Sequence, residues 1–199
     1  MRSDPAALVR HDARRAGDVM RYHTWPVVQQ QTGAHHTWNV CRILVTIWPD
    51  APADAIRYAL FHDAGELGPG DVPFPYKMQS PSLKHAFDQM EEQSLRNQGI
   101  TLPVLTDEWR WRIKTADLIE MLEKGLDEFL MGNTYGIPIV TQITGVLEER
   151  MAIMASSSLY PDRQAVSVYL TRRLDLFFAA SRLQERVLDR RTYTRINQP

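Results

Sequence analysis

The sequence predicts a single all-α domain, and three observations support this fold class. Apolar residues recur at spacings of three and four along most of the 199-residue chain, which is the periodicity of amphipathic helices. No segment shows the strict alternation of apolar and polar residues that indicates a ladder of strands. The chain has no internal repeat, low-complexity segment or linker, so we expect one domain over residues 1–199.

Two helices are predicted in the first part of the chain. The first contains His36 on its buried face and ends before Pro49. Its apolar stripe consists of Val40, Ile43, Leu44 and Ile47. The second begins near Asp50 with Pro52 in its first turn, and its spacing directs Asp63 toward the interior. The apolar stripe of this helix consists of Ile56, Ala59 and Leu60.

A turn-rich loop separates these helices from the rest of the chain. The loop covers residues 65–81 and is rich in glycine and proline, and loops of that length inside compact domains are usually functional. In the long helix that follows, Ile113 and Met121 lie four residues on either side of Asp117, which therefore shares their apolar face. The remaining helices are expected over residues 81–98, 106–131, 137–156 and from 161 onward.

Composition and charge exclude several classes of function. A net charge of -1 argues against a general nucleic-acid or acidic-membrane binder, because such partners are recruited by an excess of Lys and Arg. Cys41 is the only cysteine, so neither an internal disulfide nor a cysteine-based zinc site can form. The sequence shows no signal peptide and no apolar run of bilayer length. We therefore expect a cytoplasmic protein without nucleic-acid or membrane partners.

Four side chains of the kinds that bind metals lie on predicted buried faces. They are His36, His62, Asp63 and Asp117. Taken singly, His36 could be a hydrogen-bonded core histidine, and the adjacent pair at 62–63 could lie on the surface. Because an unpaired buried charge is very costly, inward carboxylates require a cation. Three helices that direct such groups inward favour a shared divalent metal, for which Mn, Co, Fe, Ni, Zn and Mg all suit the ligand set.

The residues after His62 form an extended motif. Residues 62–66 read His-Asp-Ala-Gly-Glu, and residues 70–77 read Gly-Asp-Val-Pro-Phe-Pro-Tyr-Lys. With a His before it and an Asp after it, this run resembles the HD-domain superfamily of metal-dependent phosphohydrolases, in particular bacterial 5′-deoxynucleotidases and compact phage deoxynucleotide triphosphohydrolases. The resemblance is strongest over residues 20–130 and implies a compact HD-domain helical bundle with His36, His62, Asp63 and Asp117 as metal ligands.

The position before the first metal ligand departs from the family pattern. The family usually has Glu there, whereas this chain has His35. Because consecutive helical residues point about 100° apart, both histidines cannot easily face one metal. We assign the metal to His36, whose face continues through Val40 and Ile43.

The resemblance implies hydrolysis by a metal-activated water. Glu66, four residues after His62, is expected to exchange a proton with the attacking water or the leaving oxygen. Asp71 is expected to orient the same water network. On the residues alone, Glu66 could equally be a surface residue at a helix end, and Asp71 could be an ordinary turn residue.

The family resemblance also assigns the substrate-binding residues. Arg21 and Lys77 are expected to bind phosphate, the first as a bidentate fork and the second as a point charge. Tyr22 is expected to pack against the sugar and to leave no room for a 2′-hydroxyl, so that deoxynucleotides are preferred. Thr24 and Pro75 would line the base. Alternatively, Arg21 and Tyr22 form an interface pair on a loop.

We predict a metal-dependent hydrolase of 2′-deoxynucleotides, and the leaving group remains open between two alternatives. In the short separation of Asp63 from Asp117 and in segment 21–24 the chain is more similar to the compact phage enzymes, and this resemblance favours a dATP-type deoxynucleoside triphosphate triphosphohydrolase over a 5′-deoxynucleotidase. A triphosphate needs further cations, and the candidates are His23, Lys84, Arg110 and Lys114. A non-catalytic nucleotide-binding HD protein would be expected to lack a ligand, and none is missing. The family also implies a homo-oligomer, either a dimer or a hexamer.

Overall fold

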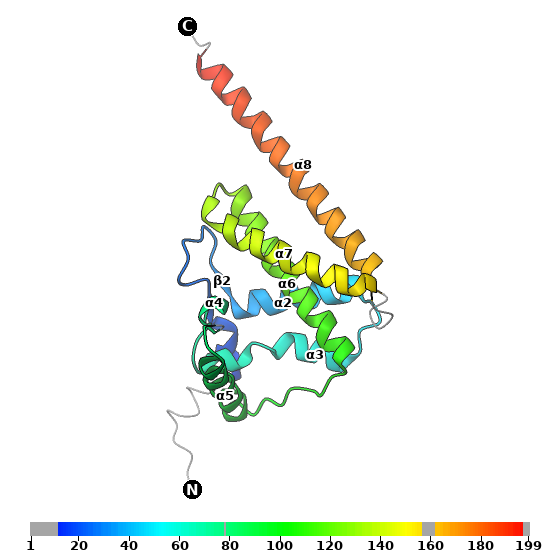
Figure 1. The fold of residues 1–199 in the computed structure, drawn as a ribbon. Coiled ribbons are helices and arrows are strands. Elements are labelled where there is room, and N and C mark those ends of the chain that lie inside the picture. The colour runs from blue at the N-terminus through cyan, green and yellow to red at the C-terminus, as the bar shows by residue number, and fades with distance from the viewer. Residues whose placement is uncertain (1–11, 78, 157–161, 197–199) are drawn as a thin grey trace. The chain divides into compact units, whose positions relative to one another are not determined.

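The computed structural model describes residues 12–77, 79–156 and 162–196, and most of these residues are helical (Figure 1). The predicted all-α class is therefore confirmed. The chain divides into two compact units, residues 1–120 and residues 121–199, and the long helix α6 (Asp107–Leu130) runs from the first into the second. All the predicted site residues belong to the first unit.

The first unit consists of short and medium-length helices with one small sheet. In chain order its elements are η1 (Ala13–Asp18), β1 (Met20–Arg21), β2 (Gln31–Thr32), α2 (Gly33–Ile47), α3 (Ala53–Phe61), η2 (Ala64–Leu67), α4 (Phe74–Lys77), α5 (Pro81–Asn97) and the first part of α6.

Helix α2 supplies the centre of the core in the first unit. It begins at Gly33 because the Thr32 hydroxyl caps its first turn and accepts the backbone N–H of His35 at 3.3 Å. Its predicted apolar stripe is confirmed, since Val40, Ile43 and Leu44 are fully buried and Ile47 is nearly so. Helix α3 packs against α2.

Helix α3 differs from its prediction in two respects. Its buried residues are Ala55 and Ala59, whereas Leu60 is 46% exposed, so the predicted stripe was partly wrong. These small side chains face the neighbouring helix, where a bulky leucine would hold the two backbones apart. The helix also ends at Phe61, and Asp63 follows its cap in a turn rather than on its last turn. Helical spacing therefore does not set the direction of the Asp63 carboxylate.

The glycine after the His-Asp pair allows α5 to approach the site. A Cβ on Gly65 would lie 2.7 Å from the backbone oxygen of Glu91 in α5, so any larger residue would push this helix away. Residues 65–81 are not a single loop as predicted, because they contain η2 and α4. Close packing of η2 on α5 stabilises a segment whose glycines and prolines alone indicate only turns.

A two-stranded antiparallel sheet was not predicted. Met20 pairs with Thr32 and Arg21 pairs with Gln31. Each strand is only two residues long, so neither could show the alternation on which strand prediction depends. The sheet places Arg21 beside the start of α2, and thus beside His36.

The second unit contains the rest of α6, η3 (Thr134–Gly136), α7 (Ile137–Ser156) and α8 (Arg163–Ile196). The bounds of α7 match the predicted helix. Buried charges are paired here: Lys124 lies 2.6 Å from Glu128, and Glu123 accepts the Tyr169 hydroxyl at 2.7 Å. Every helix among the described residues is too short or too polar to cross a lipid bilayer.

Candidate active site

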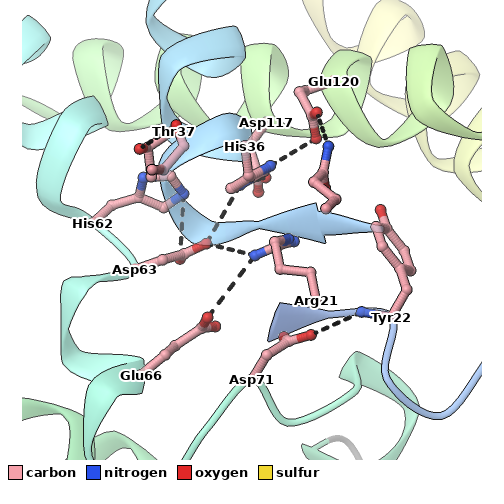
Figure 2. Close-up of polar contacts among 12 residues, drawn as sticks. Arg21, Tyr22, His36, Thr37, His62, Asp63, Glu66, Asp71, Asp117 and Glu120 are labelled. Carbon is pink, nitrogen blue, oxygen red and sulfur yellow. Dashed lines mark hydrogen bonds and ion pairs between the residues drawn. The ribbon is translucent and has the colours of Figure 1, made fainter. Parts of the chain in front are cut away.

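Two histidines from different segments point the same ring nitrogen toward a common centre (Figure 2). The Nδ1 atom of His36 lies 2.6 Å from the Glu120 carboxylate, and the Nδ1 atom of His62 lies 2.7 Å from the Ala59 carbonyl oxygen. Both partners are acceptors, so each Nδ1 carries a hydrogen, and in the neutral ring each Nε2 keeps its lone pair. This is the arrangement that fixes histidines as metal ligands.

The Nε2 atoms face two carboxylates. Nε2 of His36 lies 3.2 Å from Asp117 Oδ1 and 3.3 Å from Asp63 Oδ2, and Nε2 of His62 lies 3.3 Å from Asp63 Oδ1. Both Nε2 atoms are buried and neither forms a hydrogen bond with the described residues. Lone pairs that face carboxylate oxygens repel each other unless a proton or a metal cation lies among them. The residues present therefore fit a divalent metal.

Three of the four predicted ligands form a group with the spacing of a metal site. One ligand atom each of His36, His62 and Asp117 lies within 4.8 Å of the others. Asp63 borders this group, but its Oδ2 also accepts a hydrogen bond of 2.7 Å from Nη1 of Arg21. The grouping supports the predicted divalent-metal cofactor.

The two adjacent histidines of α2 occupy different environments. His36 is 0% exposed and faces the centre, whereas His35 is exposed on the other side of the helix. Consecutive residues of one helix cannot share a face, so the geometry agrees with the choice of His36. Burial and Arg21 oppose protonation of His36, but Asp117, Asp63 and Glu120 outweigh them and raise its pKa well above the usual value. The centre attracts positive charge.

Arg21 supplies a buried positive charge beside the His-Asp pair. It is nearly fully buried, and its Nη1 also lies 3.9 Å from Oε2 of Glu66. Burial alone would raise the pKa of the Asp63 carboxyl, but the two imidazoles and Arg21 outweigh it and hold that pKa below its usual range. Nε of Arg21 is buried and has no hydrogen-bond partner among the described residues. A donor thus remains for an anionic ligand.

Glu66 is buried in η2 and differs from the other carboxylates of the site. Burial and the charge of Asp63 raise its pKa to about 9, with Arg21 acting in the opposite direction. Its Oε2 is buried without a hydrogen-bond partner within the described part of the chain. The geometry excludes the surface alternative, because Glu66 is only 6% exposed. A carboxyl group that keeps its proton at neutral pH can act as an acid.

Asp71 holds the segment that contains Tyr22. Its Oδ2 accepts the backbone N–H of Tyr22 at 3.3 Å (Figure 2). Tyr22 has a φ of 57°, a left-handed conformation that is uncommon for a bulky residue, and such strain persists only where the surroundings impose it. The Tyr22 hydroxyl is buried and has no hydrogen-bond partner among the described residues. The structure therefore places Asp71 and Tyr22 together at the edge of the site.

The other predicted substrate-binding residues have fewer described contacts with the metal-ligand group. Lys77 forms an ion pair with Glu91 of α5. Burial lowers the pKa of Lys77, but Glu91 and the charges of Glu66 and Asp63 outweigh it and raise that pKa above its usual value. Thr24 is exposed in the segment between β1 and β2, and no described contact joins it to the site. The prediction for Pro75 concerns a side chain that is not among those the structure describes.

Sequence reasoning missed two residues at the site. Glu120 is buried beneath His36, and Gln31 of β2 donates to Glu120 at 2.7 Å. The signal for Glu120 was its position three residues after Asp117, which puts both carboxylates on one face of α6. Gln31 had no comparable signal, because it belongs to the unpredicted sheet.

An all-α fold that gathers a histidine, a His-Asp pair and a distant aspartate around one centre has the arrangement of an HD-domain phosphohydrolase. A family model described as 5′-deoxynucleotidase YfbR-like matches residues 14–110. A dATP triphosphohydrolase of Salmonella phage PMBT28 is 24% identical over an alignment of 147 residues, and the match covers 65% of this chain and 74% of that protein.

Among solved structures, the fold is similar to that of the cyanophage S-2L HD phosphohydrolase DatZ, which was determined with dA and one catalytic Zn²⁺ ion bound. The TM-score is 0.63 at 17% identity, and the match covers 88% of this chain and 98% of that chain. These findings confirm the resemblance to HD-domain phosphohydrolases, and the proteins that share it are hydrolases. The class that the comparisons share is the HD-domain deoxynucleotide phosphohydrolase.

Proposed function

We propose that the chain hydrolyses a phosphate ester bond of 2′-deoxynucleotides. The observation that carries this proposal is the convergence of two unpartnered imidazole Nε2 atoms and two carboxylates beside the buried guanidinium of Arg21, all within the described residues. A metal set alone suits many reactions, but a buried arginine with a free donor next to it suits a phosphate. The family model and both similar phage proteins support the same substrate class.

Each side chain then has a distinct role. His36, His62, Asp63 and Asp117 would hold the divalent metal, which supplies Lewis-acid activation of water and phosphate when bound. Arg21 would turn its guanidinium from Asp63 toward a phosphate oxygen, because a bound cation takes over its pairing with that carboxylate. Glu66 would deliver the proton on its carboxyl group to the leaving oxygen.

Tyr22 supports the preference for deoxynucleotides. Its ring is adjacent to Arg21, whose guanidinium carbon lies 5.9 Å from the ring centroid. A sugar joined to a phosphate on Arg21 would therefore lie near this ring. The unusual backbone conformation of Tyr22 and the hydrogen bond from its N–H to Asp71 hold the backbone from which the ring projects, and this favours a ring that stays near a 2′-hydroxyl.

The number of phosphates is the finer part of the proposal, and Lys114 supports a triphosphate. Its Nζ lies 2.6 Å from Oδ2 of Asp117, yet the side chain is 54% exposed. The ammonium group thus lies beside one of the predicted metal ligands and in contact with solvent, within reach of a substrate held at the site. In contrast, Lys84 pairs with Asp88 on the exposed surface of α5, and His23 and Arg110 are also exposed. The dATP triphosphohydrolase relative agrees with this choice and with adenine as the base.

The alternative is a 5′-deoxynucleotidase, which the matching family model favours. It would use the same metal centre, Arg21 and Tyr22, but it would release inorganic phosphate from a monophosphate. Lys114 would then serve only to hold Asp117. The predicted dimer or hexamer and the cytoplasmic location stay predictions under either alternative.

A substrate panel tests both parts of the proposal. Deoxy- and ribonucleoside mono-, di- and triphosphates are incubated with Mn²⁺ or Co²⁺, and phosphate, pyrophosphate and triphosphate are detected separately. We expect dATP to give deoxyadenosine and triphosphate, with ATP turned over much more slowly because Tyr22 excludes the 2′-hydroxyl. Release of phosphate from deoxynucleoside monophosphates alone would establish the 5′-deoxynucleotidase. Equal turnover of dATP and ATP would remove the sugar-selecting role from Tyr22.

Replacement of Lys114 by glutamine should affect triphosphates more than monophosphates. An ammonium group that contacts a phosphate oxygen contributes about 1.5–3 kcal/mol, so kcat/KM for dATP should fall roughly 10- to 100-fold. Any turnover of dAMP should change much less. Lys84→Gln removes the same charge from the exposed side of α5 and is the matched control. An equal loss for both nucleotides would mean that Lys114 acts through Asp117 and not on the phosphates.

A further inference from the structure

Glu120 and Gln31 form a buried hydrogen-bonded chain behind His36. One oxygen of Glu120 lies 2.6 Å from Nδ1 of His36, and the other accepts the Gln31 side-chain amide at 2.7 Å. His36 is 0% exposed, and the other two residues are each 2% exposed. The three side chains come from α2, α6 and β2, so these hydrogen bonds join three elements that are separate in the sequence.

The hydrogen bond to Glu120 fixes both the orientation and the tautomer of the His36 imidazole. Since Glu120 accepts the hydrogen on Nδ1, Nε2 of the neutral ring presents its lone pair to Asp117 and Asp63, and the ring cannot rotate without breaking a buried hydrogen bond to a carboxylate. A carboxylate beside Nδ1 also makes the imidazole a more basic ligand. Both effects favour a cation on the opposite side of the ring.

Gln31 links Glu120 to Arg21, the residue proposed to bind phosphate. Its backbone pairs with Arg21 across the small sheet, while its side chain holds Glu120. The position of Arg21 is thereby tied to the same carboxylate that orients His36. A short sheet of two residues per strand has little stability of its own, so this buried side-chain contact stabilises its register.

We propose that Glu120 is a positioning residue for the metal centre, acting through His36, and that Gln31 couples it to the strand that presents Arg21. This inference rests on the proposed metal-dependent function but concerns residues that touch neither metal nor substrate. Without the Glu120 carboxylate, His36 can rotate and adopt the other tautomer, so the centre binds a divalent cation more weakly. Weaker metal binding is therefore the direct consequence, and slower turnover follows from it.

The test measures metal affinity without any nucleotide. Purified full-length protein is titrated with Co²⁺, whose visible absorption reports ligand geometry, and with Mn²⁺ by calorimetry. In Glu120→Gln we expect Kd for the metal to rise about 10- to 100-fold, as for other partners of ligating histidines. Excess metal should restore part of kcat. Glu123→Gln is the matched control, since Glu123 is a buried carboxylate on the same helix that bonds Tyr169 and not His36.

A second variant keeps the test decisive if Glu120→Gln does not fold. Gln31→Met removes the donor to Glu120 but leaves the contact with His36, so Kd should rise only about 3- to 10-fold. The proposal is overturned if folded Glu120→Gln binds Co²⁺ as tightly as the wild type, or if Glu123→Gln weakens binding equally. If Glu120→Gln is unfolded, unchanged binding in Gln31→Met overturns it. Failure of the wild type to bind any divalent metal would overturn the proposed function as well, whereas absence of nucleotide turnover alone would not affect this inference.

Discussion

Replacing His36 by glutamine should abolish metal binding and lower turnover by about 10³-fold or more, whereas the same change at His35 should leave both nearly unchanged. A loss of this size corresponds to about 4 kcal/mol of transition-state stabilisation, which is within what a bound metal supplies. His36 presents a buried Nε2 to two carboxylates, and its neighbour faces solvent. The pair is a natural control because both variants change the same residue type on the same turn of α2.

The measurements are Co²⁺ titration, turnover at saturating metal, and thermal unfolding with and without metal. Metal should raise the melting temperature of the wild type and of His35→Gln but not of His36→Gln, because a ligand stabilises only a protein that binds it. Circular dichroism shows whether His36→Gln keeps the helical fold. Equal losses in the two variants, or metal-dependent stabilisation that survives in His36→Gln, would contradict the assignment of His36 as a ligand.

The helices that could be predicted are those whose stability depends on a long apolar stripe. Helix α2 ends before Pro49 as predicted, because its buried residues repeat at spacings of three and four, and α7 has its predicted bounds. The end of α3 could not be predicted, since its last turn and the following His-Asp pair have the same apolar character. There the packing of η2 against α5, which requires Gly65, sets the backbone. Such a contact between distant segments is absent from local spacing.

In the candidate site, too, some residues could be predicted from the sequence and others depend on contacts between distant segments. The histidines and aspartates that converge could be predicted because ionisable groups in apolar helices need a partner. Glu120 belongs to this class too, and the rule that identified Asp117 would have found it one turn later. Gln31 and the ion pair between Lys77 and Glu91 depend on the β1–β2 pairing and on the position of α5. Those are tertiary arrangements, so no periodicity in one sequence indicates them.

Replacing Glu66 by glutamine should lower kcat by about 10²- to 10⁴-fold, the usual contribution of a positioned general acid or base. The glutamine amide would keep the shape of the side chain but could neither hold nor release a proton in place of the carboxyl group. Metal affinity should stay close to that of the wild type, because Glu66 is not one of the residues grouped around the metal centre. This combination separates a proton-transfer role from a ligand role and is measured by Co²⁺ titration together with kcat at saturating metal.

The pH profile gives a second, independent readout for Glu66. Burial beside Asp63 raises the pKa of Glu66 to about 9, so the acid is protonated at neutral pH and loses its proton as the pH rises. If Glu66 donates its proton to the leaving oxygen, wild-type turnover falls on the alkaline side, and this limb is missing from the residual activity of Glu66→Gln. Glu66→Asp keeps the acid but withdraws it by one methylene, so it should retain the alkaline limb at reduced kcat. A variant Glu66→Gln with wild-type kcat, or with an unchanged alkaline limb, would assign the proton transfer to another group.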